Sequence, residues 1–208
     1  KSFFNEATLV NAVNYAKKNG AKIHLMGLVS KGGVHSSFEH LTALCDLFHL
    51  KKADNVFIHA FTDGRDCNPK SAFETIKELE NKIQETSINI ASVIGRYFAM
   101  DRDQRWERIK KAYDLLIHQK GKVVNSASEA ILHSYANNIT DEFIEPYLIE
   151  NSKGKITEND VVLCFNFRTD RCRQITSALT QKSYSVQEMH PLNLHYLTMT
   201  NYDKSFNN

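Results

Sequence analysis

The feature that most constrains the fold is the alternation of short apolar runs with amphipathic stretches along the 208 residues. Each run is apolar on successive residues, which is typical of strands that are covered on both faces of a parallel sheet. The stretches between the runs carry apolar residues at helical spacing, and parallel neighbours need such crossovers. The pattern therefore predicts a three-layer α/β/α fold around a mostly parallel sheet of about five strands.

The same pattern sets the expected boundaries of the elements. Buried strands are expected at residues 23–29, 55–61, about 88–94, 161–166 and 194–200. Helices are expected from Leu9 to a stop at Gly20, and then over residues 36–48, 68–83, 106–116, 126–134 and 171–179. Start signals precede two of them, namely the capping box Ser36-x-x-Glu39 and the pair Asn68-Pro69. Residues 147–149 and 155–156 are predicted to form a small hairpin excursion.

Charge and composition remove several classes of protein. The 26 basic and 24 acidic side chains give a net charge of only +2, far from the basic balance of a dedicated nucleic-acid binder. A nucleic-acid contact around residues 102–111 is only a weaker alternative. The sequence lacks an apolar run of the roughly 20 residues that cross a bilayer, and its N-terminus lacks the apolar stretch of a signal peptide. We therefore expect a soluble, cytoplasmic protein with neither a nucleic-acid nor a membrane partner.

The residue types that bind metals show no ligand spacing. The four cysteines form neither a CxxC pair nor a zinc-finger pattern and are predicted to be free thiols: Cys45, Cys67, Cys164 and Cys172. His24 and His59 lie inside expected strands and are predicted to be packed, hydrogen-bonded core residues. We expect no metal site in this chain.

Polar segments follow four of the five expected strands, at residues 30–36, 62–66, 95–102 and 167–171. Ligands of open α/β sheets bind outside the carboxyl ends of the strands, so these segments are expected to converge on one crevice. Its expected inventory is five arginines and one histidine, offset by three aspartates: Arg65, Arg96, Arg102, Arg168, Arg171 and His35, with Asp66, Asp101 and Asp170.

The excess of arginine in this crevice predicts an anionic ligand. Two guanidinium groups about 6 Å apart repel by roughly 3 kcal/mol at an effective dielectric constant of about 20. Three aspartates cannot neutralise five arginines, which favours a small acidic molecule that carries carboxylate or phosphate. Helices that start after His35, Arg102 and Arg168 would add backbone N–H donors for the same anion.

Several of these residues can also be explained by structural roles alone. The pair Gly32-Gly33 is equally well explained as a simple turn, and Asp63-Gly64 is a common turn dipeptide. The basic residues of the helix at 106–116 and its start are predicted to form a solvated face: Arg105, Arg108, Lys110 and Lys111. No Gly-x-Ser-x-Gly elbow occurs, so the sequence offers anion-binding groups and no evident nucleophile.

Five motifs, in this order, resemble those of the cofactor-independent phosphoglycerate mutase family. They are Leu25-Met26-Gly27-Leu28-Val29-Ser30-x-Gly32-Gly33-Val34-His35-Ser36, Asp63-Gly64-Arg65-Asp66, Gly95-Arg96-Tyr97-x-x-Met100-Asp101-Arg102-Asp103-x-Arg105-Trp106, Asp141-Glu142-Phe143 and Asn166-Phe167-Arg168-x-Asp170-Arg171. Thr169 stands where the family more often has Pro or Ala, a change that leaves both flanking arginines in place.

The resemblance implies an enzyme that interconverts 3-phosphoglycerate and 2-phosphoglycerate in glycolysis through a phosphoserine intermediate. It implies two domains: a phosphatase-like domain with the serine and two divalent metals, usually manganese, and an inserted domain that holds the substrate. Residues 1–208 resemble the inserted domain alone, so the chain by itself is expected to be inactive. The complete enzyme is expected to be monomeric. A stand-alone module that binds a sugar phosphate or an organic acid remains the alternative.

The resemblance also assigns roles to individual residues. It implies that eight residues bind the substrate: His35, Arg65, Asp66, Arg96, Arg102, Arg168, Asp170 and Arg171. Asp66 resembles the partner of the substrate hydroxyl and would act as a general base, which suits a carboxylate beside an alcohol that is to be phosphorylated.

Overall fold

The computed structural model describes residues 3–206 and confirms the α/β class. A seven-stranded sheet has the order β4-β5-β3-β2-β1-β6-β7. All neighbouring strands run parallel except β3 and β5, which are antiparallel. The strands are β1 (Ile23–Leu28), β2 (Val56–Thr62), β3 (Ile88–Gly95), β4 (Lys122–Val124), β5 (Tyr147–Ile149), β6 (Val161–Cys164) and β7 (His195–Thr198).

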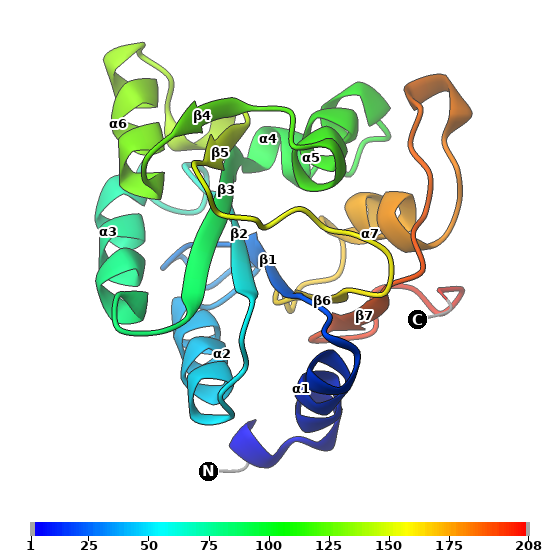
Figure 1. Cartoon of the computed structure of the whole chain (residues 1–208). Coiled ribbons are helices and arrows are strands. Elements are labelled where there is room, and N and C mark those ends of the chain that lie inside the picture. The colour runs from blue at the N-terminus through cyan, green and yellow to red at the C-terminus, as the bar shows by residue number, and fades with distance from the viewer. Residues whose placement is uncertain (1–2, 207–208) are drawn as a thin grey trace.

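Helices cover both faces of the sheet, which makes the three predicted layers (Figure 1). One apolar core joins the sheet to α1 (Ala7–Asn19), α2 (Phe38–Leu50), α3 (Ala72–Ile83) and α6 (Ala127–Ala136). The other joins it to α4 (Arg96–Ala99), α5 (Trp106–His118) and α7 (Arg173–Thr180). Within residues 3–206, no helix is both long enough and apolar enough to cross a membrane.

The predicted hairpin at 147–149 and 155–156 is wrong. Residues 147–149 form β5, which lies between β3 and β4 in the main sheet. Strands of three residues are too short to show the periodicity of apolar residues that identifies a strand, so β4 was missed. With β4 and β5, the sheet has seven strands instead of about five. The segment after β5 crosses one face of the sheet, where Gly154 packs so closely that a Cβ atom would collide with Ala91 and press tightly against Phe57.

Three helix starts differ from the prediction. The N-cap of α2 is Ser37, whose Oγ accepts a hydrogen bond from the His40 N–H, whereas the Ser36 hydroxyl donates to the Leu28 carbonyl. Helix α3 begins at Ala72, after Asn68-Pro69, and α7 begins at Arg173. A distant carboxylate caps α3, because Asp141 Oδ2 accepts from the N–H groups of Ser71 and Ala72 at 2.8 and 2.9 Å. A cap of this kind leaves no local sequence signal.

His24 and His59 are packed, hydrogen-bonded core residues, as predicted. They also belong to a buried polar chain across β1, β2 and β3. His24 Nδ1 lies 3.0 Å from His59 Nε2, and His59 Nδ1 lies 2.8 Å from Ser92 Oγ. The other ring nitrogen of His24 lies 3.3 Å from Asp160 Oδ2. Burial is the main cause that lowers the pKa of both histidines, so both rings are neutral near pH 7. All four cysteines are free thiols.

Candidate anion-binding site

The loops after β1, β2, β3 and β6 meet beyond the carboxyl ends of these strands, as predicted. His35, in the loop after β1, lies close to Asp66 after β2 and to Asp170 after β6. Arg96, directly after β3, reaches the β2 loop. The His35 carbonyl also accepts from the N–H groups of Phe167 and Arg168 at 2.9 and 3.3 Å, which ties the β1 and β6 loops together.

A buried corner forms around Arg96, whose side chain is only 2% exposed. Arg96 Nη1 donates to Asp63 Oδ1 at 2.7 Å and to Asp66 Oδ2 at 2.6 Å. Asp63 also accepts from the N–H groups of Arg65 and Asp66 and from the Ser30 hydroxyl. Burial alone raises the pKa of the Asp63 carboxyl, but these hydrogen bonds outweigh burial and hold that pKa below its usual value. Asp63 is therefore charged and fixed, although the sequence analysis gave it no role in binding.

Arg96 starts α4 where the chain leaves β3, and the neighbouring segment fixes its position. Gly95 donates to the Ile144 carbonyl at 2.7 Å, and a Cβ atom at Gly95 would collide with the Glu142 carbonyl. The 3₁₀ helix η2 (Asp141–Phe143) therefore packs against the strand end. The Thr62 hydroxyl donates to the Asp141 carbonyl at 2.7 Å, so η2 also fixes the end of β2.

His35 lies between two carboxylates without a hydrogen bond to either. Its Nε2 is 3.6 Å from Asp66 Oδ2 and its Nδ1 is 3.7 Å from Asp170 Oδ1, while the ring is 3% exposed. Burial, followed by the charge of Arg96, lowers the pKa of His35 more than the two aspartates raise it. Among residues 3–206, three buried polar side-chain atoms lack a hydrogen-bond partner: His35 Nδ1, Asp170 Oδ1 and Arg171 Nε. All three belong to this site, although Asp170 Oδ1 also forms an ion pair with Arg168. Buried polar atoms without a hydrogen bond call for an explanation, such as a functional role or a bound water or ion.

Three further arginines form an exposed arm of the site. Arg102 Nη1 lies 2.8 Å from Asp170 Oδ2, and Arg168 Nε lies 3.1 Å from Asp170 Oδ1. Arg65 Nη1 lies 3.2 Å from Glu142 Oε1. Burial raises the pKa of Asp170, but the hydrogen bond from Arg102 and the charge of Arg168 bring it below its usual value. These pairs are about half exposed, so a stronger anion could replace the carboxylate partners.

A cavity of about 270 Å³ lies between the corner and the arm. Five arginines, three carboxylates and two aromatic rings line it, so that the lining side chains carry two more positive than negative charges. The lining residues are Arg65, Arg96, Tyr97, Asp101, Arg102, Asp103, Arg108, Glu142, Phe143 and Arg171. Burial and then the charges of Arg102, Arg96 and Arg65 lower the pKa of Arg171. This repulsion among cations is the physical sign of a site that an anion would stabilise.

Arg108 corrects the prediction of a solvated face on α5. Its guanidinium carbon lies 3.8 Å from the centre of the Tyr97 ring, its Nη1 lies 3.4 Å from Asp101 Oδ1, and its side chain is 16% exposed. Asp101, expected as a counter-charge, also orders the loop before α5, because its Oδ2 accepts from the N–H groups of Asp103 and Arg105. Arg108 was missed because Tyr97, its packing partner, lies in a different helix.

Metal ions do not fit the residues described. Within residues 3–206, no group of three or more His, Cys, Asp or Glu side chains could hold a metal ion. The metals that the resemblance implies therefore have no ligand set within these residues. The guanidinium groups gathered here are of the type that can hold carboxylate or phosphate.

Comparison with known proteins settles the family. The family model described as "BPG-independent PGAM N-terminus" matches residues 1–204. The chain belongs to this family. It is 54% identical over 215 residues to a 2,3-bisphosphoglycerate-independent phosphoglycerate mutase of Flavobacterium psychrophilum and 50% identical over 212 residues to one of Flavobacterium johnsoniae. Each match covers 100% of this chain and 42% of the relative.

A solved structure of Leishmania mexicana phosphoglycerate mutase, at low cobalt concentration, has the same fold. It is 28% identical with a TM-score of 0.88, over 98% of this chain and 40% of that one. The chain thus spans about two fifths of the length of the relatives that it matches.

Proposed function

We propose that this chain is the substrate-holding domain of a phosphoglycerate mutase that interconverts 3-phosphoglycerate and 2-phosphoglycerate without a bisphosphoglycerate cofactor. Residues 1–208 would form one domain, inserted into a phosphatase-like domain. The observation that carries the proposal is the arginine-lined cavity, whose lining includes Arg171, with a buried Nε that has no hydrogen bond within residues 3–206. A phosphoglycerate supplies both a carboxylate and a phosphate, which suit separate arginines.

The proposed substrate contacts are His35, Arg65, Asp66, Arg96, Arg102, Arg168, Asp170 and Arg171. Arg96 and Arg171 would hold one anionic group at the buried side, while Arg102, Arg168 and Arg65 would take the other by releasing their carboxylate partners. We add Arg108, because it lines the same cavity.

Asp66 is the proposed general base. Its Oδ2 is occupied by Arg96 at 2.6 Å, which leaves Oδ1 to accept a proton from the substrate hydroxyl as that oxygen takes up phosphate. Neutral His35, 3.6 Å from Oδ2, would orient the carboxylate without adding a competing positive charge.

The phosphatase-like domain would supply the nucleophilic serine and two divalent metals, which the family resemblance gives as manganese. When bound there, the metals would activate the serine. The residues described here would hold and reorient the glycerate between removal and return of the phosphate. We further propose that the complete protein is monomeric and cytoplasmic, and the four free thiols support the reducing compartment.

The test is turnover of 3-phosphoglycerate by the complete protein, of which this chain is a part. Asp66→Asn keeps the shape of the side chain and removes the base, so kcat should fall by about 100-fold or more with a smaller change in KM. The exposed Asp54→Asn is the matched control and should leave both constants unchanged. Normal kcat in Asp66→Asn would remove the general base from the proposal, and no mutase activity in the unsubstituted protein would overturn the function.

A stand-alone module for a sugar phosphate or an organic acid is the second candidate, because the arginine cavity is formed entirely within this chain. Calorimetry on the chain separates the two. Weak or absent binding of 3-phosphoglycerate supports the mutase domain, since part of the site would lie elsewhere. Micromolar affinity for such an anion would favour the stand-alone module.

A further inference from the structure

The three carboxylates that line the cavity of the candidate site differ in how each is neutralised. Asp101 is buried, and its Oδ2 accepts three hydrogen bonds from neighbouring N–H groups. Asp103 is exposed to solvent. The Glu142 side chain is only 17% exposed, and within residues 3–206 its carboxylate accepts one hydrogen bond, from Arg65 at 3.2 Å. Glu142 therefore depends on a single exposed arginine for its counter-charge.

The backbone of Glu142 is fixed at the edge of the cavity. A Cβ atom on Gly64, just after β2, would collide with the Glu142 nitrogen, and one on Gly95, at the end of β3, would collide with the Glu142 carbonyl oxygen. The preceding residue is also held, because Asp141 Oδ1 accepts from the Tyr135 hydroxyl at 2.5 Å. With its backbone enclosed in this way, Glu142 can change position only by turning its side chain.

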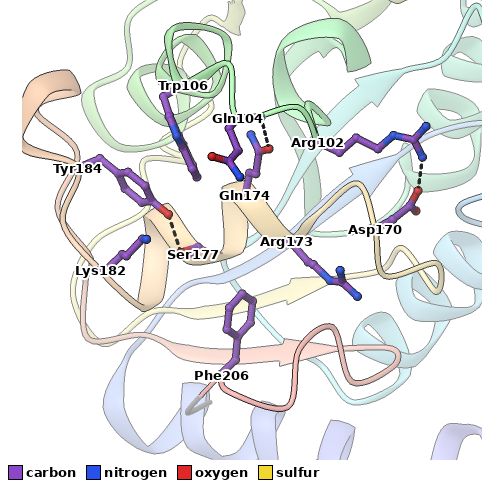
Figure 2. Close-up of a pocket in the computed structure, with 10 residues that line it drawn as sticks. All are labelled: Arg102, Gln104, Trp106, Asp170, Arg173, Gln174, Ser177, Lys182, Tyr184 and Phe206. Atoms are coloured by element: carbon purple, nitrogen blue, oxygen red, sulfur yellow. Dashed lines mark hydrogen bonds and ion pairs between the residues drawn. The ribbon is translucent and has the colours of Figure 1, made fainter.

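Asp170, the other carboxylate paired with the exposed arm, has more than one positive neighbour. Its Oδ2 accepts from Arg102 Nη1 at 2.8 Å, as Figure 2 shows, and its Oδ1 lies 3.1 Å from Arg168 Nε. An anion that takes Arg102 therefore leaves Asp170 with a second cation. An anion that takes Arg65 leaves Glu142 without any ion pair to residues 3–206.

The charge of Glu142 limits how much negative charge the cavity can accept. The lining side chains carry two more positive than negative charges. A carboxylate and one phosphate together bring about 2.5–3 negative charges at pH 7, which is close to this excess. A second phosphate would add about 1.5–2 more, without a matching cation and near the Glu142 carboxylate. Like charges a few ångströms apart in a partly buried site repel each other appreciably.

We propose that Glu142 is a specificity-determining residue, whose fixed carboxylate admits ligands with one phosphate and one carboxylate and excludes bisphosphorylated ones. The inference deepens the proposed function and rests on it, because that proposal places a phosphoglycerate in this cavity. Arg65 neutralises Glu142 while the cavity is empty. Once Arg65 turns to a singly phosphorylated ligand, the Glu142 carboxylate repels any further phosphate. Without this carboxylate, the arginines would favour the more highly charged anion.

Calorimetry on the complete protein tests the proposal with two ligands, 3-phosphoglycerate and 2,3-bisphosphoglycerate. The unsubstituted protein should bind 3-phosphoglycerate more tightly. Glu142→Gln keeps the shape of the side chain and removes its charge, so Kd for the bisphosphate should fall by about tenfold or more. Kd for 3-phosphoglycerate should fall by less than about threefold, because that ligand places less negative charge in the cavity. The ratio of the two Kd values measures the discrimination.

Glu145→Gln is the matched control. Glu145 follows on the same segment, is half-exposed and pairs with Lys111, and it lies outside the lining of this cavity. Its substitution should leave both Kd values unchanged. An unchanged ratio in Glu142→Gln would overturn the proposal, and so would tighter binding of the bisphosphate than of 3-phosphoglycerate by the unsubstituted protein.

Failure of the mutase function is a separate result, because it is measured as turnover, whereas the discrimination is measured as binding. A complete protein without turnover, in which Glu142→Gln still lowers the ratio, would lose the mutase assignment and keep Glu142 as the residue that selects the ligand. A protein with normal turnover and an unchanged ratio would keep the mutase assignment and lose the role of Glu142.

Discussion

The buried corner around Arg96 and the exposed arm around Arg102 use the same chemistry in different surroundings. Arg96 is 2% exposed and bridges Asp63 and Asp66 at 2.7 and 2.6 Å. Arg102 is 46% exposed and meets Asp170 at 2.8 Å. Removing one partner of a buried pair costs about 3–5 kcal/mol, whereas an exposed pair contributes about 0–1 kcal/mol. The corner is therefore part of the fold, while the arm can exchange its carboxylate for the anion of a ligand.

Substitution of each arginine by alanine tests this difference most strongly. Arg96→Ala leaves Asp63 and Asp66 facing each other without a cation, so the free energy of unfolding should fall by about 3–5 kcal/mol. Arg102→Ala should lower it by less than about 1 kcal/mol. Urea denaturation of both variants measures the two values. In the complete protein, both substitutions should lower turnover, and near-normal turnover of a folded Arg96→Ala would contradict the site assignment.

Mild acid should weaken the buried regions first. Three buried histidines have a pKa below their ordinary value of 6.5, chiefly because of burial: His24, His35 and His59. In the unfolded chain they bind protons near pH 6.5, and in the folded chain they do not. The stability that they contribute is therefore complete above about pH 6.5 and is lost as the pH falls toward their folded pKa values, by up to about 1.4 kcal/mol per pH unit for each histidine.

Urea midpoints measured between about pH 7 and pH 5 check this expectation. His35→Gln should reduce the slope of stability against pH, because one titrating group is lost. The exposed His118→Gln serves as the control and should keep the original slope. A stability that is constant across this range would show that folding leaves the pKa values of these histidines unchanged, because the folded and unfolded chains would then bind the same number of protons.

Arg108 lies between Arg96 and Arg102 in exposure, and its substitution should affect substrate binding. It is 16% exposed and packs on Tyr97, and within residues 3–206 its one ion pair, with Asp101, is 3.4 Å long. Arg108→Ala in the complete protein should raise KM for 3-phosphoglycerate by about tenfold, as for loss of one charge-assisted contact. Arg105→Ala, three residues away and exposed, should leave KM unchanged. Equal KM values for the two variants would show that Arg108 does not bind substrate and would agree with the solvated face that the sequence predicted.

The sequence predicted the part of the site that depends on strand ends. The apolar runs located β1, β2, β3 and β6, and parallel geometry then brought His35, Arg96 and Asp170 together. The residues that were missed depend on contacts between distant segments. Asp63 resembled an ordinary turn residue until Arg96 and Ser30 were placed against it. Arg108 resembled a surface residue because Tyr97 precedes it in another helix, and the start of α3 depends on Asp141, some 70 positions away.

The contacts of the 3₁₀ helix η2 restrict which insertions and deletions this fold can accept during evolution. Loops normally tolerate insertions and deletions, because their backbone bonds mainly with water. Here Asp141 caps α3 and binds Thr62, while the residues beside it close over Gly95. Adding or deleting one residue in η2 would disrupt contacts to the start of α3 and to the ends of β2 and β3 at the same time. The η2 segment is therefore expected to tolerate changes of length poorly, although it connects two elements as an ordinary loop does.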